Sequence, residues 1–152
     1  MVGGIVDVFW LGGPTLEAVV RQYQRLVGAP LPPPAWSLGF HQSRWGYRSV
    51  EELEGTVRTY AAAAIPLDTI WSDIDHMDGY RVFTLEQRAY AAPRMRAFLR
   101  RLHAAGRRWV PILDPGVKVD PGYPAYDAGL AGGLFLKGVD GLPYVGRVRT
   151  DV

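Results

Sequence analysis

The chain has 152 residues, of which 48% are hydrophobic and 21% are charged, and its formal net charge is +2. These values predict one globular domain, and so small a charge indicates no particular class of partner. The lack of cysteine excludes disulfides and thiolate metal sites. The apolar runs are shorter than the roughly 20 residues of a membrane helix, so we expect no membrane span. The first ten residues do not resemble a signal peptide, and the sequence indicates no compartment.

The first 34 residues predict a strand, a helix and an extended linker. Residues 3–13, GGIVDVFWLGG, are an apolar run bounded by glycine pairs, which favours a strand. A helix is expected to open at Pro14 and Thr15, because apolar residues then recur with helical spacing, and Gly28 closes it. The prolines between positions 30 and 34 favour an extended linker.

After the linker, the pattern of apolar residues becomes regular. Short apolar runs at 36–40, 67–72 and 109–113 predict three strands, and segments with helical periodicity separate them. None of these runs alternates between apolar and polar residues, so we predict βαβ units and a parallel sheet. Residues 134–146 then predict a hairpin that turns at Asp140-Gly141.

The two helices between these strands carry different signals. Ser49 and Glu52 form a capping box that starts the first helix, and Pro66 stops it. The second helix closes near Gly106 and is rich in arginine, which makes it the best nucleic-acid candidate in the chain. Four apolar residues at helical spacing define its buried face: Met95, Phe98, Leu99 and Leu102. We therefore interpret the arginines as a solvated helix face and predict no nucleic-acid partner.

The residues that could carry chemistry all follow predicted strands. They lie at 41–47, 72–80 and 114–117, and in a (β/α) barrel the loops after the strands build the active site. The densest stretch is WSDIDHMDGY, residues 71–80. Neither βα turn contains a glycine-rich phosphate-binding motif, which argues against a nucleotide site.

The aspartates of this stretch could bind a metal or a sugar. If the preceding strand continues, Asp73 and Asp75 point to the same face. Together with Asp78 they lack the spacing of a helix-loop-helix calcium site, and His76 alone makes a zinc or iron site a poor but open alternative. Sugar binding is supported by aromatic residues in the same loops, namely Trp45, Tyr47 and Tyr80, although such residues more often pack. From the residues alone, both interpretations stay open.

Three long runs carry a family resemblance: PPPAWSLGFHQSRWGYRSVEEL, IPLDTIWSDIDHMDGYRVFTLE and GRRWVPILDPGV. They resemble the start of the catalytic barrel of glycoside hydrolase family 31, which includes α-glucosidases and α-xylosidases. The resemblance implies an α/β fold, namely a partial TIM (β/α)8 barrel with about the first three βα units and parallel strands. It also implies that residues 1–30 are the end of an N-terminal β-sandwich domain with a connecting helix. Residues 31–152 are then the first part of the barrel.

The same resemblance implies a site for a terminal α-linked glucose or xylose unit. In the family, the first aspartate of W-x-D-I-D hydrogen-bonds sugar hydroxyls in the −1 subsite, and aromatic and apolar residues line it. The matching residues here are Asp73, Ile74, Trp45 and Val117. We expect Asp75, Asp78 and Asp114 to satisfy loop amides, and His76 departs from the family's usual tyrosine. The implied partner is an α-glucoside or α-xyloside oligosaccharide, with no cofactor and no metal.

The family's two catalytic carboxylates have no counterpart in this sequence. A retaining glycosidase needs a nucleophile and an acid/base about 5 to 5.5 Å apart, and the family's nucleophile lies in a W-x-D-M-N-E motif that these 152 residues lack. We therefore expect a fragment of a retaining α-glycosidase, inactive alone, whose nucleophile and acid/base lie beyond its end. Two alternatives are a non-catalytic sugar-binding or regulatory remnant, and a metal-dependent barrel hydrolase using Asp73, Asp75 and His76.

Overall fold

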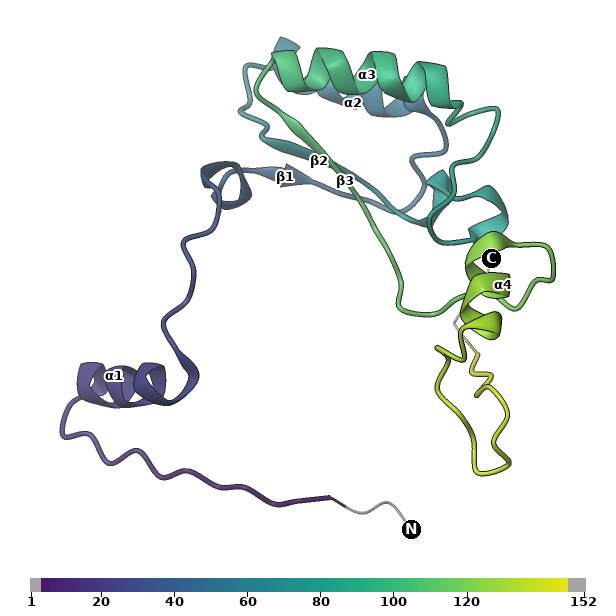
Figure 1. Cartoon of the computed structure of the whole chain (residues 1–152). Helices are drawn as coiled ribbons and strands as arrows, with labels where there is room; N and C mark the ends of the chain where they lie inside the picture. Colours follow the sequence, from purple (N-terminus) through teal and green to yellow (C-terminus); the bar gives the residue numbers. More distant parts are fainter. Residues whose placement is uncertain (1–3, 148–152) are drawn as a thin grey trace. The chain divides into compact units, whose positions relative to one another are not determined.

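The computed structural model describes residues 4–147 and divides the chain into two compact units, Met1–Pro34 and Ala35–Val152. In Figure 1 the first unit carries helix α1, and the second carries the three strands and the other helices. The division lies at the end of the proline-rich linker, directly after Pro34. That residues 1–30 end a β-sandwich domain stays a prediction. Within residues 4–147, no helix is both long and apolar enough to cross a membrane.

Helix α1 spans Leu16–Val27, where the spacing of apolar residues predicted it. Thr15 caps its start, because the threonine hydroxyl accepts the backbone N–H of Ala18 at 3.2 Å. Gly28 ends it with a φ of +90° and donates its N–H to the Gln24 carbonyl at 2.8 Å. Both ends therefore follow from the local sequence.

The strand predicted over residues 3–13 is wrong for the part that the structure describes. Residues 4–13 form no strand, and apolar side chains such as Ile5 and Trp10 are exposed. A strand is stable only when neighbouring backbone takes up its N–H and C=O groups. Among the described residues of the first unit, no second strand does so.

Three short parallel strands form the centre of the second unit. Strands β1 (His41–Gln42), β2 (Thr69–Ser72) and β3 (Arg108–Pro111) lie side by side in that order. In the register of the sheet, His41 lies opposite Thr69, which lies opposite Arg108. Each connection between consecutive strands contains one α-helix, so the predicted α/β class with parallel strands is confirmed.

The first strand begins later than the sequence predicted. Ala35–Leu38 form a 3₁₀ helix, after which the N–H of Gly39 bonds back to the Trp36 carbonyl at 3.3 Å. The prediction of a strand over 36–40 is therefore wrong, because this backbone hydrogen-bonds within the turn. The connection to β2 starts at Phe40, whose N–H donates to the Asp68 carboxylate at 3.0 Å.

Helices α2 (Val50–Ala62) and α3 (Ala92–Ala104) lie side by side over the sheet (Figure 1). The hydroxyl of Ser49 accepts the N–H of Glu52 at 3.2 Å, as predicted. Buried side chains from both helices, β2 and the adjoining loops form one core: Tyr47, Val50, Leu53, Ile70, Tyr90, Met95, Phe98 and Leu102. Burying each large apolar side chain stabilises the fold by about 1.5 to 3 kcal/mol. This core fixes the ends of the strands, from which the loops emerge.

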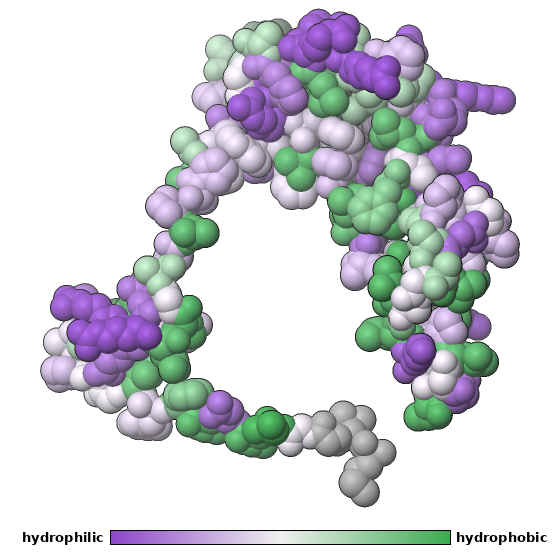
Figure 2. Space-filling model, viewed as in Figure 1, coloured by the Kyte–Doolittle hydropathy of each residue, from purple (hydrophilic) through white to green (hydrophobic). Residues whose placement is uncertain are grey.

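The arginines of α3 lie on its outer face. Arg94 and Arg101 form ion pairs with Glu51 and Glu54 of α2 and remain largely exposed. Figure 2 shows hydrophilic surface gathered over these two helices. The interpretation of a solvated helix face is confirmed.

Helix α4, Pro124–Ala131, was not predicted from the sequence. Pro124 at its first turn favours a helix start, but Gly129 in its interior lowers helix propensity. The glycine is needed for packing, because an added Cβ would lie 2.5 Å from the Phe135 ring. Packing with the following segment therefore overrides propensity at this position.

The hairpin predicted at the end of the chain is present. Lys137 and Pro143 pair in antiparallel fashion, and the N–H of Gly141 donates to the Gly138 carbonyl at 3.0 Å. Gly141 has a φ of +77°, a conformation that glycine adopts without steric cost. The hairpin turn predicted at Asp140-Gly141 is therefore confirmed.

Candidate functional site

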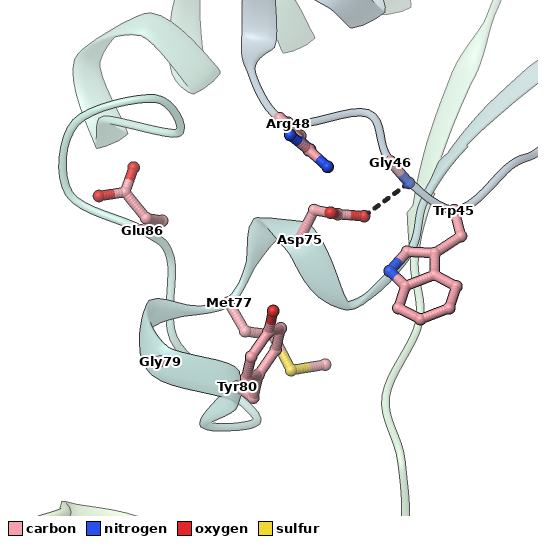
Figure 3. Close-up of a pocket in the computed structure, with 8 residues that line it drawn as sticks. All are labelled: Trp45, Gly46, Arg48, Asp75, Met77, Gly79, Tyr80 and Glu86. Carbon is pink, nitrogen blue, oxygen red and sulfur yellow. Dashed lines mark hydrogen bonds between the residues drawn. The ribbon is translucent and has the colours of Figure 1, made fainter. Parts of the chain in front are cut away.

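A cavity of about 590 Å³ lies where the loops after β1 and β2 meet. Both loops extend from the carboxyl ends of parallel strands, which is where the barrel pattern places a site. Figure 3 shows the residues that line the cavity: Trp45, Gly46, Arg48, Asp75, Met77, Gly79, Tyr80 and Glu86.

One hydrogen bond joins the two loops. The backbone N–H of Gly46 donates to the Asp75 carboxylate at 2.9 Å (Figure 3). Gly46 has a φ of +101°, so the chain turns sharply just after Trp45 in a conformation that favours glycine. The expectation that Asp75 satisfies a loop amide is confirmed. Through this bond the loop that carries Trp45 is tied to the WSDIDHMDGY loop.

Asp73 starts the second loop as a cap. Strand β2 ends at Ser72, and Ile74–His76 form a 3₁₀ turn in which an Asp73 carboxylate oxygen accepts the Ile74 N–H at 2.7 Å. The strand therefore does not continue through Asp75, and the pleat that would place Asp73 and Asp75 on one face is absent. A half-buried Asp73 thus has one carboxylate oxygen engaged locally.

The four residues predicted to bind sugar lie in different surroundings. Trp45 lines the cavity and is 53% exposed. Ile74 and Val117 pack against a second apolar cluster formed by Met77, Val82 and Tyr123. Neither they nor Asp73 line the cavity. Met77 belongs to both the cluster and the cavity wall, so the cluster packs behind one wall of the cavity. That the four residues meet on one sugar stays a prediction.

His76 is a buried part of the loop rather than an exposed ligand. It is 2% exposed, and its Nδ1 lies 2.7 Å from the Asp73 carbonyl, which can only accept a hydrogen bond. Nδ1 therefore carries the proton. The ring also packs edge-on against Tyr90 and Trp109. Within residues 4–147, no three histidine, aspartate or glutamate side chains gather in a way that could hold a metal ion. The metal-site alternative thus gains no support.

Arg48, Met77 and Glu86 also line the cavity, and the sequence did not single them out. The Glu86 carboxylate accepts the N–H groups of Ala89 at 2.5 Å and Arg88 at 3.0 Å. These backbone donors hold the pKa of Glu86 below its usual range, so the side chain is charged at neutral pH. The loop that brings Glu86 to the cavity has no periodic pattern, so no sequence signal indicated its position. Two aromatic rings and three charged groups give the cavity the composition of a site for a polar small molecule.

Comparison with known proteins identifies relatives over almost the whole chain. A model of the glycosyl hydrolases family 31 TIM-barrel domain matches residues 30–151. A probable alpha-glucosidase of Oryza sativa subsp. japonica is 47% identical over 148 residues, which cover 97% of this chain and 17% of that protein. Alpha-xylosidase 1 of Arabidopsis thaliana is 43% identical over 148 residues, with 97% and 16% covered.

A solved structure shares the fold of this chain. The crystal structure of the glucosidase II alpha subunit bound to alpha3-Glc2 matches with a TM-score of 0.80 and 34% identity, over 85% of this chain and 14% of that one. These matches confirm the predicted partial (β/α)8 barrel. The chain spans about a sixth of the length of the curated relatives it matches.

Proposed function

Because the chain belongs to glycosyl hydrolase family 31, we propose that its loops hold the terminal glucose or xylose unit of an α-linked oligosaccharide for hydrolysis. The rice relative is named an alpha-glucosidase and the Arabidopsis relative an alpha-xylosidase, which supports this class of substrate. The observation that carries the proposal is the hydrogen bond between Gly46 and Asp75. It ties the loop of Trp45 to the loop of Asp73 at the carboxyl end of the sheet.

Each proposed contact follows from the chemistry of its side chain. One oxygen of Asp73 bonds the Ile74 N–H, and the other accepts sugar hydroxyls. The exposed Trp45 ring covers the apolar face of the sugar, and Ile74 and Val117 form an apolar wall of the sugar site. A charged acceptor forms stronger hydrogen bonds than a neutral one, so Asp73 contributes most of the orientation.

We assign substrate holding, and not nucleophilic attack, to these residues. Retention requires a nucleophile and an acid/base about 5 to 5.5 Å apart across the scissile bond. The W-x-D-M-N-E motif that would carry the family's nucleophile does not occur in these 152 residues. The contribution of this chain is then positional, because a sugar fixed in a reactive orientation has a lower barrier to attack.

Binding of a monosaccharide tests the proposal. We expect ligand-observed NMR titration to detect glucose or xylose binding, and Asp73→Asn to weaken it about tenfold, since a hydrogen bond to a charged group contributes about 1.5 kcal/mol or more. The matched control is Asp68→Asn, which makes the same change at the opposite end of β2, where Asp68 accepts the Phe40 N–H. Equal effects of the two substitutions would contradict the proposal.

Turnover tests the assigned role. The purified 152-residue chain should hydrolyse an aryl α-glucoside no faster than its Asp73→Asn variant, because no nucleophile is assigned within it. Hydrolysis that disappeared in the Asp73→Asn variant would make Asp73 itself a catalytic residue and overturn the assignment.

A further inference from the structure

The ring of His76 is hydrogen-bonded to the backbone of Asp73. His76 Nδ1 donates to the Asp73 carbonyl at 2.7 Å, and one oxygen of the Asp73 carboxylate accepts the Ile74 N–H at 2.7 Å. The backbone and the side chain of Asp73 are therefore held within the same turn. We propose that His76 is a positioning residue for the sugar site, and that its Nδ1–H fixes the direction in which the other Asp73 oxygen meets a sugar hydroxyl. This inference rests on the proposed function.

The ring makes the shorter of two hydrogen bonds from His76 to this carbonyl. The backbone N–H of His76 also donates to the Asp73 carbonyl, but at 3.3 Å. Hydrogen bonds from N–H to oxygen are usually about 2.9 Å long and weaken beyond that length. The turn is therefore closed only loosely by its own backbone. Without the ring bond, Asp73 could change its backbone angles, and its carboxylate would turn with them.

The surrounding core holds the His76 ring in place. His76 is 2% exposed, and the rings of Tyr90 and Trp109 pack edge-on against it, with centroids 6.3 and 5.9 Å away. Trp109 is itself fixed, because its Nε1 donates to the Ser72 hydroxyl at 2.8 Å. The backbone of His76 is held as well, since its carbonyl accepts the Glu86 N–H at 2.8 Å. The donor that binds Asp73 is therefore rigid.

A carboxylate with a fixed direction should bind a sugar more tightly than one that can turn. Binding to a mobile side chain must also order that side chain, which lowers the affinity. The Ile74 N–H occupies one Asp73 oxygen, so the turn decides where the other oxygen points. The family's usual tyrosine has a C–H at the position of Nδ1 and cannot donate there, so this hydrogen bond distinguishes His76 from that residue.

Two substitutions separate the donor of His76 from its ring. His76→Asn keeps an N–H donor, because the Nδ2 of asparagine is bonded to Cγ as the Nδ1 of histidine is, but it loses the ring. His76→Phe keeps an aromatic ring and loses the donor. The matched control is His41→Phe, because His41 bonds the Trp36 carbonyl and lies opposite Thr69, at the other end of β2 from Asp73. Near-ultraviolet circular dichroism verifies that each variant is folded.

We expect ligand-observed NMR titration to show that His76→Phe weakens glucose binding about fivefold, the effect of one hydrogen bond. His76→Asn and His41→Phe should each stay within about twofold. Stability should follow the opposite order, because His76→Asn removes a buried ring and should lower the urea midpoint more than His76→Phe does. A role in stability alone would instead make the loss of affinity follow the loss of stability. The amide of Ile74 should also exchange with solvent about fivefold faster in His76→Phe.

The outcomes distinguish the inference from the proposed function. Glucose binding that Asp73→Asn weakens but His76→Phe leaves unchanged overturns the inference and leaves the proposed function standing. Equal losses in His76→Phe and His76→Asn do the same, because the donor would then not be the cause. If His76→Asn does not fold, equal losses in His76→Phe and His41→Phe overturn the inference. Glucose binding that Asp73→Asn leaves unchanged overturns the proposed function, and the inference fails with it. A folded chain that binds no glucose overturns both.

Discussion

Helices α1 and α3 carry similar sequence patterns but have different surroundings. Both have apolar residues at helical spacing, yet no residue of α1 is buried, whereas α3 buries Met95, Phe98 and Leu102. Within the second unit, α2 and β3 contact α3 and cover its apolar face. In the first unit, no other helix or strand is described. An amphipathic pattern therefore predicts a helix, but the stability that it contributes depends on what covers the helix.

The largest change in the free energy of unfolding is expected when two leucines near the ends of these helices are compared. Leu102→Ala leaves a cavity in the core and should lower the free energy of unfolding by about 3 kcal/mol. Leu26→Ala removes a side chain that is 49% exposed and should change it by less than about 0.5 kcal/mol. Urea unfolding followed by tryptophan fluorescence measures both. Similar losses would show that α1 is buried to the same extent as α3.

The pH dependence of stability should also differ between a tyrosine of the core and a tyrosine of α1. Tyr90 is fully buried, its hydroxyl donates to the Tyr47 carbonyl at 2.5 Å, and burial raises its pKa to about 12. Its folded pKa therefore exceeds its unfolded value near 10, so the stability it contributes is present below pH 10 and is lost as pH rises through 12. Tyr90→Phe should remove this alkaline loss and cost about 1 to 3 kcal/mol at neutral pH, because the Tyr47 carbonyl loses its donor.

The control for Tyr90 lies on α1. Tyr23 is 54% exposed, and Tyr23→Phe should leave both the stability and its pH dependence unchanged. Urea midpoints at about pH 8, 10 and 11 provide the measurement. If Tyr90→Phe kept the alkaline loss of the parent chain, the buried hydroxyl would not be its source.

Removing a helix cap should change stability by a smaller amount, and the change should differ between the two units. Ser49→Ala removes the acceptor for the Glu52 N–H at the start of α2, and it should lower the free energy of unfolding by about 1 kcal/mol. Thr15→Ala removes the corresponding acceptor at α1. It should reduce far-ultraviolet helical signal without moving the unfolding transition of the core. A shift of that transition by Thr15→Ala would contradict the comparison.

The smallest effect is expected at the hydrogen bond that joins the loops after β1 and β2. Asp75→Ala leaves the Gly46 N–H without its acceptor, so the amide of Gly46 should exchange with solvent about fivefold faster, in line with the loss of one hydrogen bond. Asp140→Ala, which removes the acceptor of the Leu142 N–H in the hairpin, should leave Gly46 unaffected. Unchanged exchange at Gly46 in the Asp75 variant would mean that this bond does not join the loops.

Local signals in the sequence predicted much of the fold. Thr15 and Gly28 marked the ends of α1, Ser49 marked the start of α2, and the apolar stripe of α3 gave its buried face. These features depend on residues a few positions apart, so the sequence alone determines them. The three motif runs were specific enough to predict the family.

Features that depend on distant contacts could not be predicted in the same way. Strand β1 covers only His41 and Gln42 because these are the residues that pair with Thr69 and Ile70 of β2, which lie far along the chain. Glu86 reaches the cavity through an irregular loop, and Gly129 is accommodated in α4 because Phe135 packs on it. The predicted site residues Asp73 and Trp45 were chosen by resemblance, and their contact with a sugar stays a prediction.

Chemical-shift mapping with glucose on the isotope-labelled 152-residue chain would show whether the loops after β1 and β2 hold a sugar. We expect the Trp45 indole and the amides of Asp73 and Ile74 to shift on titration. Amides at the opposite ends of the strands, such as Thr69 and Arg108, should stay unchanged. Asp73→Asn should remove the shifts. Shifts confined to the exposed arginine face of α3, or shifts at Trp45 that persist in the Asp73→Asn variant, would contradict the claim that these loops hold a sugar.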